Sequence, residues 1–391
     1  MVNFSLILFL ICVFIPIYSY VIFPWYMQLK ASQKLPVKNN YEEVNTWPAI
    51  TVVFSVFNEE KVIKRKLESL LNTNYPKDKL SILIGSDNST DGTHTIIESF
   101  IQTHSNIILI NYNERQGKLK IINDLIPKCH TNYLIMTDAN VFFEPNTLKA
   151  LVYNLRKKEA QLVCGNILKF SPKNEGISNQ EIFYMNFENQ LKHNESINYN
   201  FCVGVEGGCY GIKKDSFVTV PDGFLMDDFF ITLDVISKKG KVLFEPEALC
   251  YEDVNDEPLI EFKRKIRISL GNFRNLNYYK YLLAPKYNPF AFAFFSHKIC
   301  RWITPFAILK SFVFSLILSF YFKVFILITI MYGSLIILPI AAIYFEKHKI
   351  KIPLVNSIGH FLLMNLALFI GFFKFIKANK QSAWEPPKRN V

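Results

Sequence analysis

Long apolar segments at both ends of the chain constrain its fold more than any other feature. Residues 1–29 carry no acidic or basic side chain, and about 20 apolar residues are enough to cross the hydrocarbon core of a bilayer. Three more apolar runs, at residues 303–322, 324–345 and 352–373, follow near the C-terminus. This pattern predicts a membrane protein with one soluble domain between its membrane segments.

The first segment is predicted to be an uncleaved anchor. It lacks the basic start and the small-residue cleavage motif of a signal peptide, and its aromatic residues between 18 and 26 suit a membrane interface. The lysines at 30, 34 and 38 place the next segment in the cytoplasm by the positive-inside rule. The number of spans stays open at three or four, because four would put the basic tail, residues 377–391, outside.

The formal net charge is +11. A protein this basic usually binds nucleic acid, anionic lipid or a phosphorylated substrate. No nucleic-acid motif accompanies the charge, so we expect membrane lipid and a phosphorylated substrate, and no nucleic acid. The seven cysteines show neither CxxC pairs nor metal-ligand spacing. They are interpreted as small apolar residues in a reducing compartment.

Between the anchors, short apolar runs alternate with helix-like stretches. The helix-like stretches cover residues 59–71, 93–104 and 118–126. Alternation of this kind predicts an α/β domain with a parallel sheet covered on both faces, where ligands bind beyond the carboxyl ends of the strands. The predicted strands are residues 50–57, 80–85, 107–111, 133–137 and 161–168.

Polar or charged side chains follow four of these strands. The loop after the second strand, taken alone, is more often a turn and a helix cap. Four such loops on one rim of one sheet instead predict a site for a nucleotide diphosphate. The residues predicted to bind it are Ser55, Phe57, Asn58, Glu59, Asp87, Lys118 and Asp138.

A pyrophosphate needs a divalent cation, and Mg²⁺ usually takes one or two side-chain oxygens plus substrate phosphates. Asp138 and Asn140 are two residues apart, so on an extended tip they would point to the same side. They are the predicted ligands for Mg²⁺ or Mn²⁺. Lys118 can neutralise phosphate, and Asp87 can accept hydrogen bonds from a base or ribose.

Further along the chain, a glycine pair precedes two adjacent acids. Gly207 and Gly208, with Tyr210 two residues further on, mark a stretch in which the backbone can approach a ligand closely. Asp227 and Asp228 are either a helix cap or a general base that takes a proton from an acceptor hydroxyl.

Residues 258–274 form an amphipathic helical pattern with a basic stripe at Arg264, Arg267 and Arg274. The stripe suits the membrane interface. Its arginines either meet lipid headgroups only, or one of them binds a leaving diphosphate.

Taken in order, these motifs resemble family 2 glycosyltransferases of the GT-A fold, in the membrane-embedded cellulose-synthase-like and hyaluronan-synthase-like branch. The resemblance covers about residues 48–302 and implies an α/β GT-A nucleotide-diphospho-sugar transferase domain with flanking transmembrane helices. The implied layout is an anchor at 1–29, a cytoplasmic transferase domain at 47–257, interface helices at 258–302, a transmembrane region at 303–376 and the basic tail.

The resemblance assigns roles to single residues. Asp87 matches the acid that contacts uracil, Asp138 to Asn140 match the DxD metal motif, and Asp228 matches the base, with Asp227 beside it. Gly207, Gly208 and Tyr210 match the loop on the acceptor side. Several positions depart from the pattern. Ser55 and Phe57 replace the usual Pro and Tyr of the first loop. Asn88 and Asn140 stand where the family has acids, and only Arg267 remains of the QxxRW motif, whose arginine would stabilise the leaving diphosphate.

The implied function is inverting transfer from a UDP-sugar to a growing cell-surface polysaccharide or glycan, by a multi-pass protein of the inner or plasma membrane, with possible partner subunits of a synthase or secretion complex. The incomplete QxxRW motif keeps open a second reading, single-sugar transfer to a lipid acceptor. A non-catalytic membrane subunit that only binds nucleotide-sugar is a third reading, which the retained acids disfavour. A transporter is disfavoured by the few spans and the large soluble domain.

Overall fold

The computed structural model describes residues 2–34, 44, 46–170, 177–253, 258–347 and 352–377. The chain divides into two compact units. The helical unit comprises Met1–Lys30, Lys173–Glu181 and Asn255–Asn379, and the sheet unit comprises Ala31–Pro172, Ile182–Val254 and Lys380–Val391. The predicted basic tail beyond residue 377 lies outside the described residues.

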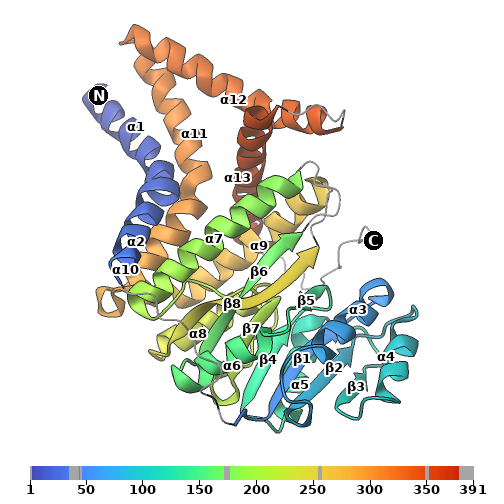
Figure 1. Cartoon of the computed structure of the whole chain (residues 1–391). Helices are drawn as coiled ribbons and strands as arrows, with labels where there is room; N and C mark the ends of the chain where they lie inside the picture. Colours follow the sequence, from blue (N-terminus) through green and yellow to red (C-terminus); the bar gives the residue numbers. More distant parts are fainter. Residues whose placement is uncertain are drawn as a thin grey trace. The chain divides into compact units, whose positions relative to one another are not determined.

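In the described part of the sheet unit, eight strands form one mixed sheet in the order β3-β2-β1-β4-β7-β6-β8-β5 (Figure 1). The first four of these are parallel, whereas β7 runs antiparallel to β4 and β6, and β5 antiparallel to β8. The strands are β1 Ile50–Val56, β2 Leu80–Ser86, β3 Ile107–Asn111, β4 Tyr133–Thr137, β5 Val141–Phe143, β6 Leu162–Phe170, β7 Cys209–Lys213 and β8 Val242–Asp253.

The five predicted strands are confirmed to within two residues at each end, and all lie in this sheet. The predicted parallel sheet is confirmed for β1 to β4, but the sheet as a whole is mixed. Strands β5 and β7 run opposite to the strands with which they pair.

Helices cover the sheet on both faces (Figure 1). Helices α3, α4 and α6 bury their apolar stripes in one core with the strands, through residues such as Leu67, Ile97 and Leu151. Helix α5 packs on β1 and β2, and its Ile121 lies so close to Gly85 that a Cβ there would come within 2.3 Å. The helices are α3 Glu60–Leu71, α4 Thr93–Ile101, α5 Lys118–Lys128, α6 Thr147–Lys157, α7 Ile177–Tyr199 and α8 Asp227–Ser237, with single 3₁₀ turns at Lys77–Lys79 and Lys214–Ser216.

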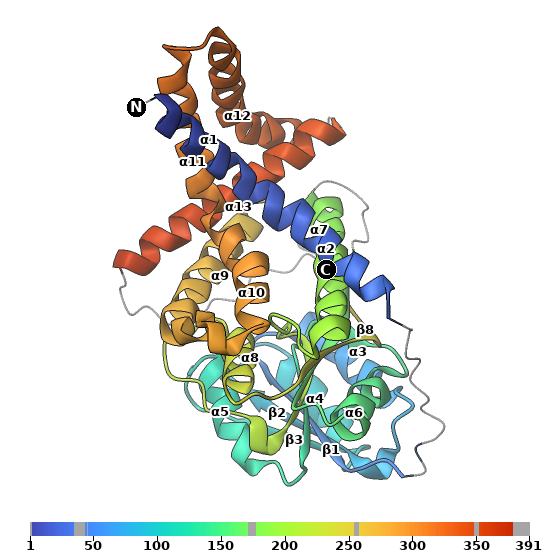
Figure 2. The ribbon, with the colours of Figure 1, turned by 90° about the vertical axis from the view of Figure 1, so that its left-hand side faces the viewer.

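In the helical unit, α1 packs against α11, and α13 packs against α9 and α12 (Figure 2). Helix α9 confirms the helix predicted at residues 258–274 and continues five residues further. The elements are α1 Val2–Ile17, a π turn Tyr18–Ile22, α2 Phe23–Ser32, α9 Pro258–Tyr279, 3₁₀ turns Lys280–Leu283 and Pro285–Tyr287, α10 Phe290–Phe294, a π turn Phe295–Ile299, α11 Cys300–Ser319, α12 Lys323–Lys347 and α13 Pro353–Lys377.

Three helical stretches among the described residues are long and apolar enough to cross a membrane: Val2–Ser32, Phe290–Ser319 and Val355–Lys377. The predicted segments 303–322 and 352–373 largely fall within the second and third of these. The predicted segment 324–345 lies in α12, of which Lys323–Leu335 is the apolar part that the described side chains cover. Membrane association therefore has a structural basis in three helices.

All seven cysteines are buried free thiols. Burial raises the pKa of Cys129 to about 11 and that of Cys164 to about 12, which makes the reactive thiolate scarce at neutral pH. Their burial agrees with the interpretation of these residues as small apolar side chains.

Candidate active site

The loops after β2 and β3 meet at Asp87, a carboxylate that is only 4% exposed. It accepts hydrogen bonds from the backbone N–H groups of Gln116, at 2.6 Å, and Gly117, at 3.0 Å. Gly117 has a φ of +88°, which favours glycine, and it directly precedes α5. The guanidinium of Arg115 lies 3.6 Å from the centre of the Phe57 ring, which brings in the loop after β1.

The loops after β1 and β2 also interlock. The side-chain oxygen of Asn58 accepts a hydrogen bond from the backbone of Thr90 at 2.8 Å, and the Glu59 N–H donates to the Thr93 hydroxyl at 2.9 Å. Asp91 accepts from the Thr93 N–H at the start of α4. The carboxylate that holds the turn before α4 is thus Asp91, not Asp87, and the N-cap residue of α4 is Gly92.

Lys118 connects the third and fourth strand ends. Its Nζ lies 2.6 Å from Oδ1 of Asp138, with the two side chains 27% and 38% exposed. Burial lowers the pKa of Lys118, but the carboxylates of Asp138, Asp227 and Asp228 outweigh it and hold that pKa above its usual value. Asp138 and the pair Asp227 and Asp228, about 90 positions later in the sequence, therefore all act on one ammonium group.

Asp138 and Asn140 lie between β4 and β5, and Asn140 Nδ2 donates to Glu252 at 3.3 Å. The described residues contain no group of three His, Cys, Asp or Glu side chains that could hold a metal. One carboxylate and one amide oxygen remain as candidate ligands. This hard-oxygen pair fits Mg²⁺ or Mn²⁺ if substrate phosphates complete the coordination shell.

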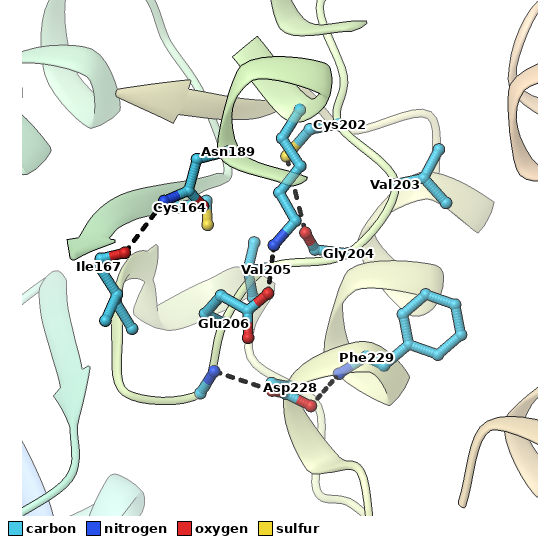
Figure 3. A network of polar contacts seen from close by, with 12 residues as sticks. Cys164, Ile167, Asn189, Cys202, Val203, Gly204, Val205, Glu206, Asp228 and Phe229 are labelled. Carbon is cyan, nitrogen blue, oxygen red and sulfur yellow. Dashed lines mark hydrogen bonds and ion pairs between the residues drawn. The ribbon is translucent and has the colours of Figure 1, made fainter. Parts of the chain in front are cut away.

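Asp228 lies in the first turn of α8 and is 7% exposed. Its Oδ2 accepts from the Gly207 N–H at 2.8 Å, and its Oδ1 from the Phe229 N–H at 2.7 Å (Figure 3). A Cβ at Gly207 would lie 3.0 Å from Oδ2, and one at Gly208 would lie 2.9 Å from Val141. The glycine pair is therefore needed for close approach to the acid and to the sheet.

Burial, and then the neighbouring carboxylates of Asp227 and Glu206, raise the pKa of Asp228 to about 7, against the opposing effect of Lys118. Figure 3 shows the Glu206 side chain close to that of Asp228. A carboxylate whose pKa lies near neutrality suits a general base.

Lys192, on α7, also belongs to this group of charged residues and was not predicted from the sequence. Its side chain is 1% exposed and forms an ion pair with Glu206. Burial lowers the pKa of Lys192, but Glu206 reverses the effect and the pKa is raised overall. Nothing in the local pattern of α7 marked this lysine, since its partner is in a separate loop.

Lys66 was also missed. It is fully buried on α3 and donates a hydrogen bond to the Thr137 hydroxyl at 2.8 Å, while that hydroxyl donates to the Gly208 carbonyl at 2.7 Å. Burial lowers the pKa of Lys66 to about 7. The signal was present: Lys66 follows Val62 and Ile63 at the helical spacing of the buried face.

Tyr210 and Arg267 are placed differently from the other predicted residues. Tyr210 is 2% exposed within β7, and burial, with the carboxylates of Asp227 and Asp228, raises its pKa. Arg267 is half-buried on α9 in the helical unit. Ser55 is half-buried in β1.

Residues 51–217 match the family model described as Glycosyl transferase family 2. A dolichyl N-acetyl-alpha-D-glucosaminyl phosphate 3-beta-D-2,3-diacetamido-2,3-dideoxy-beta-D-glucuronosyltransferase from Methanococcus voltae is 29% identical over 213 residues, which are 51% of this chain and 65% of that protein. Glycosyltransferase AglE from Haloferax volcanii is 28% identical over 39% of this chain and 49% of its own length. The matches thus span less than two thirds of these relatives.

A solved structure resembles nearly the whole chain. It is the mannosyltransferase PcManGT from Pyrobaculum calidifontis in complex with GDP-Man and Mn²⁺, with a TM-score of 0.72 and 18% identity. The similarity covers 94% of this chain and 99% of that one, so the two share a fold.

Proposed function

We propose that this chain, of which residues 51–217 match the family 2 glycosyltransferase model, transfers a sugar from a nucleotide diphosphate sugar to a hydroxyl group of an acceptor at a membrane. The observation that carries the proposal is the Asp228 carboxylate. It is buried, fixed by two backbone N–H groups, and has a pKa of about 7.

In the proposed reaction, Asp228 takes the proton of the acceptor hydroxyl while the hydroxyl oxygen bonds to the anomeric carbon of the donor. The bond from that carbon to the diphosphate oxygen breaks, and its electron pair leaves with the diphosphate. Attack from the side opposite the leaving group inverts the anomeric configuration. Each Asp228 oxygen keeps a lone pair for the proton, beside the one that accepts its backbone hydrogen bond.

Lys118 is proposed to stabilise the departing diphosphate by its positive charge, moving from Asp138 to the phosphate oxygens. A bound Mg²⁺ or Mn²⁺ would neutralise charge on the same group. Asp138 would hold this cation, with the Asn140 oxygen. The Mn²⁺ in the PcManGT complex is consistent with a divalent cation here.

The donor base is proposed to lie by Asp87, next to the loops that its contacts with Gln116 and Gly117 join. The resemblance implies uracil, whereas PcManGT was solved with GDP-Man. Both nucleotides therefore belong in the test.

A second candidate function is the addition of one sugar to a lipid-linked acceptor. Two observations favour it over polymer synthesis: the name of the Methanococcus voltae relative specifies a dolichyl-linked substrate, and the QxxRW motif keeps only Arg267. The three apolar helices would hold the chain where such an acceptor is found. We further propose that the sheet unit faces the cytoplasm, as the lysines after the first segment predict.

The test is donor turnover by the purified full chain with added membrane lipid. UDP-glucose, UDP-N-acetylglucosamine, UDP-galactose and GDP-mannose are each supplied with Mg²⁺ or Mn²⁺, and the released nucleoside diphosphate is measured. Asp228→Asn is the test variant, and Asp222→Asn, whose side chain is 72% exposed, is the control.

Release by the wild type and by Asp222→Asn, but not by Asp228→Asn, would support the proposal. The mass of the product then separates one added sugar from a polymer, and its anomeric signal in NMR reports inversion. Equal release by Asp228→Asn and the wild type would rule out Asp228 as the base.

A further inference from the structure

Asn140 differs from a carboxylate ligand because only one end of its amide can bind a cation. The carbonyl oxygen carries lone pairs, whereas the NH₂ group offers only donors. Rotation of the amide by half a turn exchanges the two ends. A metal site built on Asn140 therefore needs something that fixes which end faces the cation.

Glu252 meets this need. Its Oε1 lies 3.3 Å from Asn140 Nδ2, and the two come together because Val141 in β5 pairs with Glu252 in β8. A carboxylate can only accept hydrogen bonds, so the NH₂ end must face Glu252 and the oxygen must face away. From the part of the chain that the structure describes, Asn140 Oδ1 accepts no hydrogen bond.

Lys169 holds Glu252 from the other side. Its Nζ lies 3.6 Å from Glu252 Oε2, and the two residues pair across β6 and β8. The Lys169 side chain is 3% exposed and that of Glu252 is 16% exposed. The ion pair with Lys169 and the pairing of β6 with β8 therefore hold the Glu252 carboxylate beside the Asn140 amide.

We propose that Glu252, supported by Lys169, is a positioning residue that turns the Asn140 oxygen toward the divalent cation shared with Asp138. With Glu252 fixing its orientation, the neutral amide of Asn140 can serve as a metal ligand at a position where the family resemblance implies an acid. This inference rests on the proposed function, since it concerns the same metal site.

The test measures Mn²⁺ binding directly, by the electron paramagnetic resonance of free Mn²⁺, with purified full chain and either UDP or GDP. Glu252→Gln can donate to the Asn140 oxygen and stabilise the flipped amide. We expect it to weaken Mn²⁺ binding by about 10-fold, the effect usual for the loss of a partner that orients a ligand. Glu247→Gln, an exposed acid on the same strand, is the control and should bind as the wild type does.

The decisive variant is Asn140→Asp. An aspartate presents oxygen at both ends and needs no orientation, while Glu252 now repels it. In the Asn140→Asp background we therefore expect Glu252→Gln to strengthen Mn²⁺ binding instead of weakening it. A merely structural role of Glu252 would weaken binding in both backgrounds.

The outcomes separate this inference from the proposed function. If Glu252→Gln binds Mn²⁺ as tightly as the wild type, the proposed role of Glu252 is wrong. The same holds if Glu252→Gln weakens Mn²⁺ binding equally in the Asn140 and the Asn140→Asp backgrounds. Neither result contradicts the metal site itself. Absence of Mn²⁺ binding by the wild type with both nucleotides overturns the metal site and this inference with it, while the role of Asp228 is still decided by donor turnover.

Discussion

The ammonium group of Lys66 lies 2.8 Å from the hydroxyl of Thr137, behind the strand end that presents Asp138. Lys66 also donates to the carbonyl of Val141, so it contacts the residues on both sides of Asp138 to Asn140. Since Thr137 in turn donates to Gly208, one buried lysine holds together the metal loop and the glycine loop. Burying an ammonium group is costly, and these contacts offset that cost.

The variant Lys66→Met keeps the length of the side chain and removes its donors. It leaves the Val141 carbonyl without this partner, and we expect the free energy of unfolding to fall by about 1–3 kcal/mol. Denaturant unfolding followed by circular dichroism measures the effect. Lys64→Met, exposed on the same helix, should unfold as the wild type does. An equal loss in both variants would show that the helix, not the contact, is responsible.

The pH dependence of donor turnover should report Asp228. Its pKa of about 7 means that the base is protonated, and inactive, at lower pH, so kcat/KM should fall as the pH drops below about 7. Glu206→Gln removes one of the carboxylates that raise this pKa. We expect the acidic limb to move down by about one pH unit. Glu98→Gln, exposed on α4, should leave the limb in place; a limb that stays fixed in Glu206→Gln would contradict the assignment.

The raised pKa of Asp228 also predicts how stability varies with pH. The folded protein binds the Asp228 proton up to about pH 7, whereas the unfolded chain releases it near 3.8, the ordinary pKa of an aspartate. Stability from this group is therefore present below about pH 4 and is lost as the pH rises to about 7. Relative to Asp228→Asn, the wild type should lose roughly 2–4 kcal/mol across this window.

Unfolding of both proteins at pH 4, 5.5, 7 and 8 gives this difference. An asparagine cannot accept from both backbone N–H groups, so we expect the free energy of unfolding of Asp228→Asn to differ from that of the wild type at every pH. The change of this difference with pH is what tests the prediction. A difference that does not change with pH would mean that Asp228 titrates alike in the folded and unfolded chains.

Removal of the Lys118 charge should impair catalysis. Lys118→Met eliminates the ammonium group that is proposed to stabilise the leaving diphosphate, and we expect kcat to fall by about 100-fold. Steady-state kinetics of donor turnover measure it, with Lys120→Met on the same helix, whose lysine is 54% exposed, as the control. Unchanged kcat with a higher donor KM would instead limit Lys118 to binding.

Part of this fold could be predicted because its strands are continuous apolar runs. Strands β1 to β4 and β6 were predicted on that basis, and the rule that parallel strands end on one rim brought Asp87, Lys118 and Asp138 together. Strand β8 was missed because Glu245, Pro246 and Glu247 interrupt its pattern, and β5 because it has three residues.

The roles of the supporting residues were missed for a different reason, although the helical spacing already marked Lys66 as buried. Lys66, Lys192 and Glu252 contact partners that lie 71, 14 and 112 positions away in the chain. Each of these charged side chains is buried or half-buried. Its role depends on a partner that comes next to it only in the folded chain. The roles of Asp138, Asn140 and Asp228 came from the family resemblance and stay predictions until the variants are measured.

Because all seven cysteines are buried, the native protein should react only weakly with thiol-labelling reagents. A single cysteine introduced at Tyr321, exposed between α11 and α12, would be the dominant site for a maleimide. An impermeant reagent applied to intact cells, and then to opened ones, would reveal on which side of the membrane that turn lies. The same experiment at Lys280 would give the sidedness of the segment after α9, without first removing any native residue.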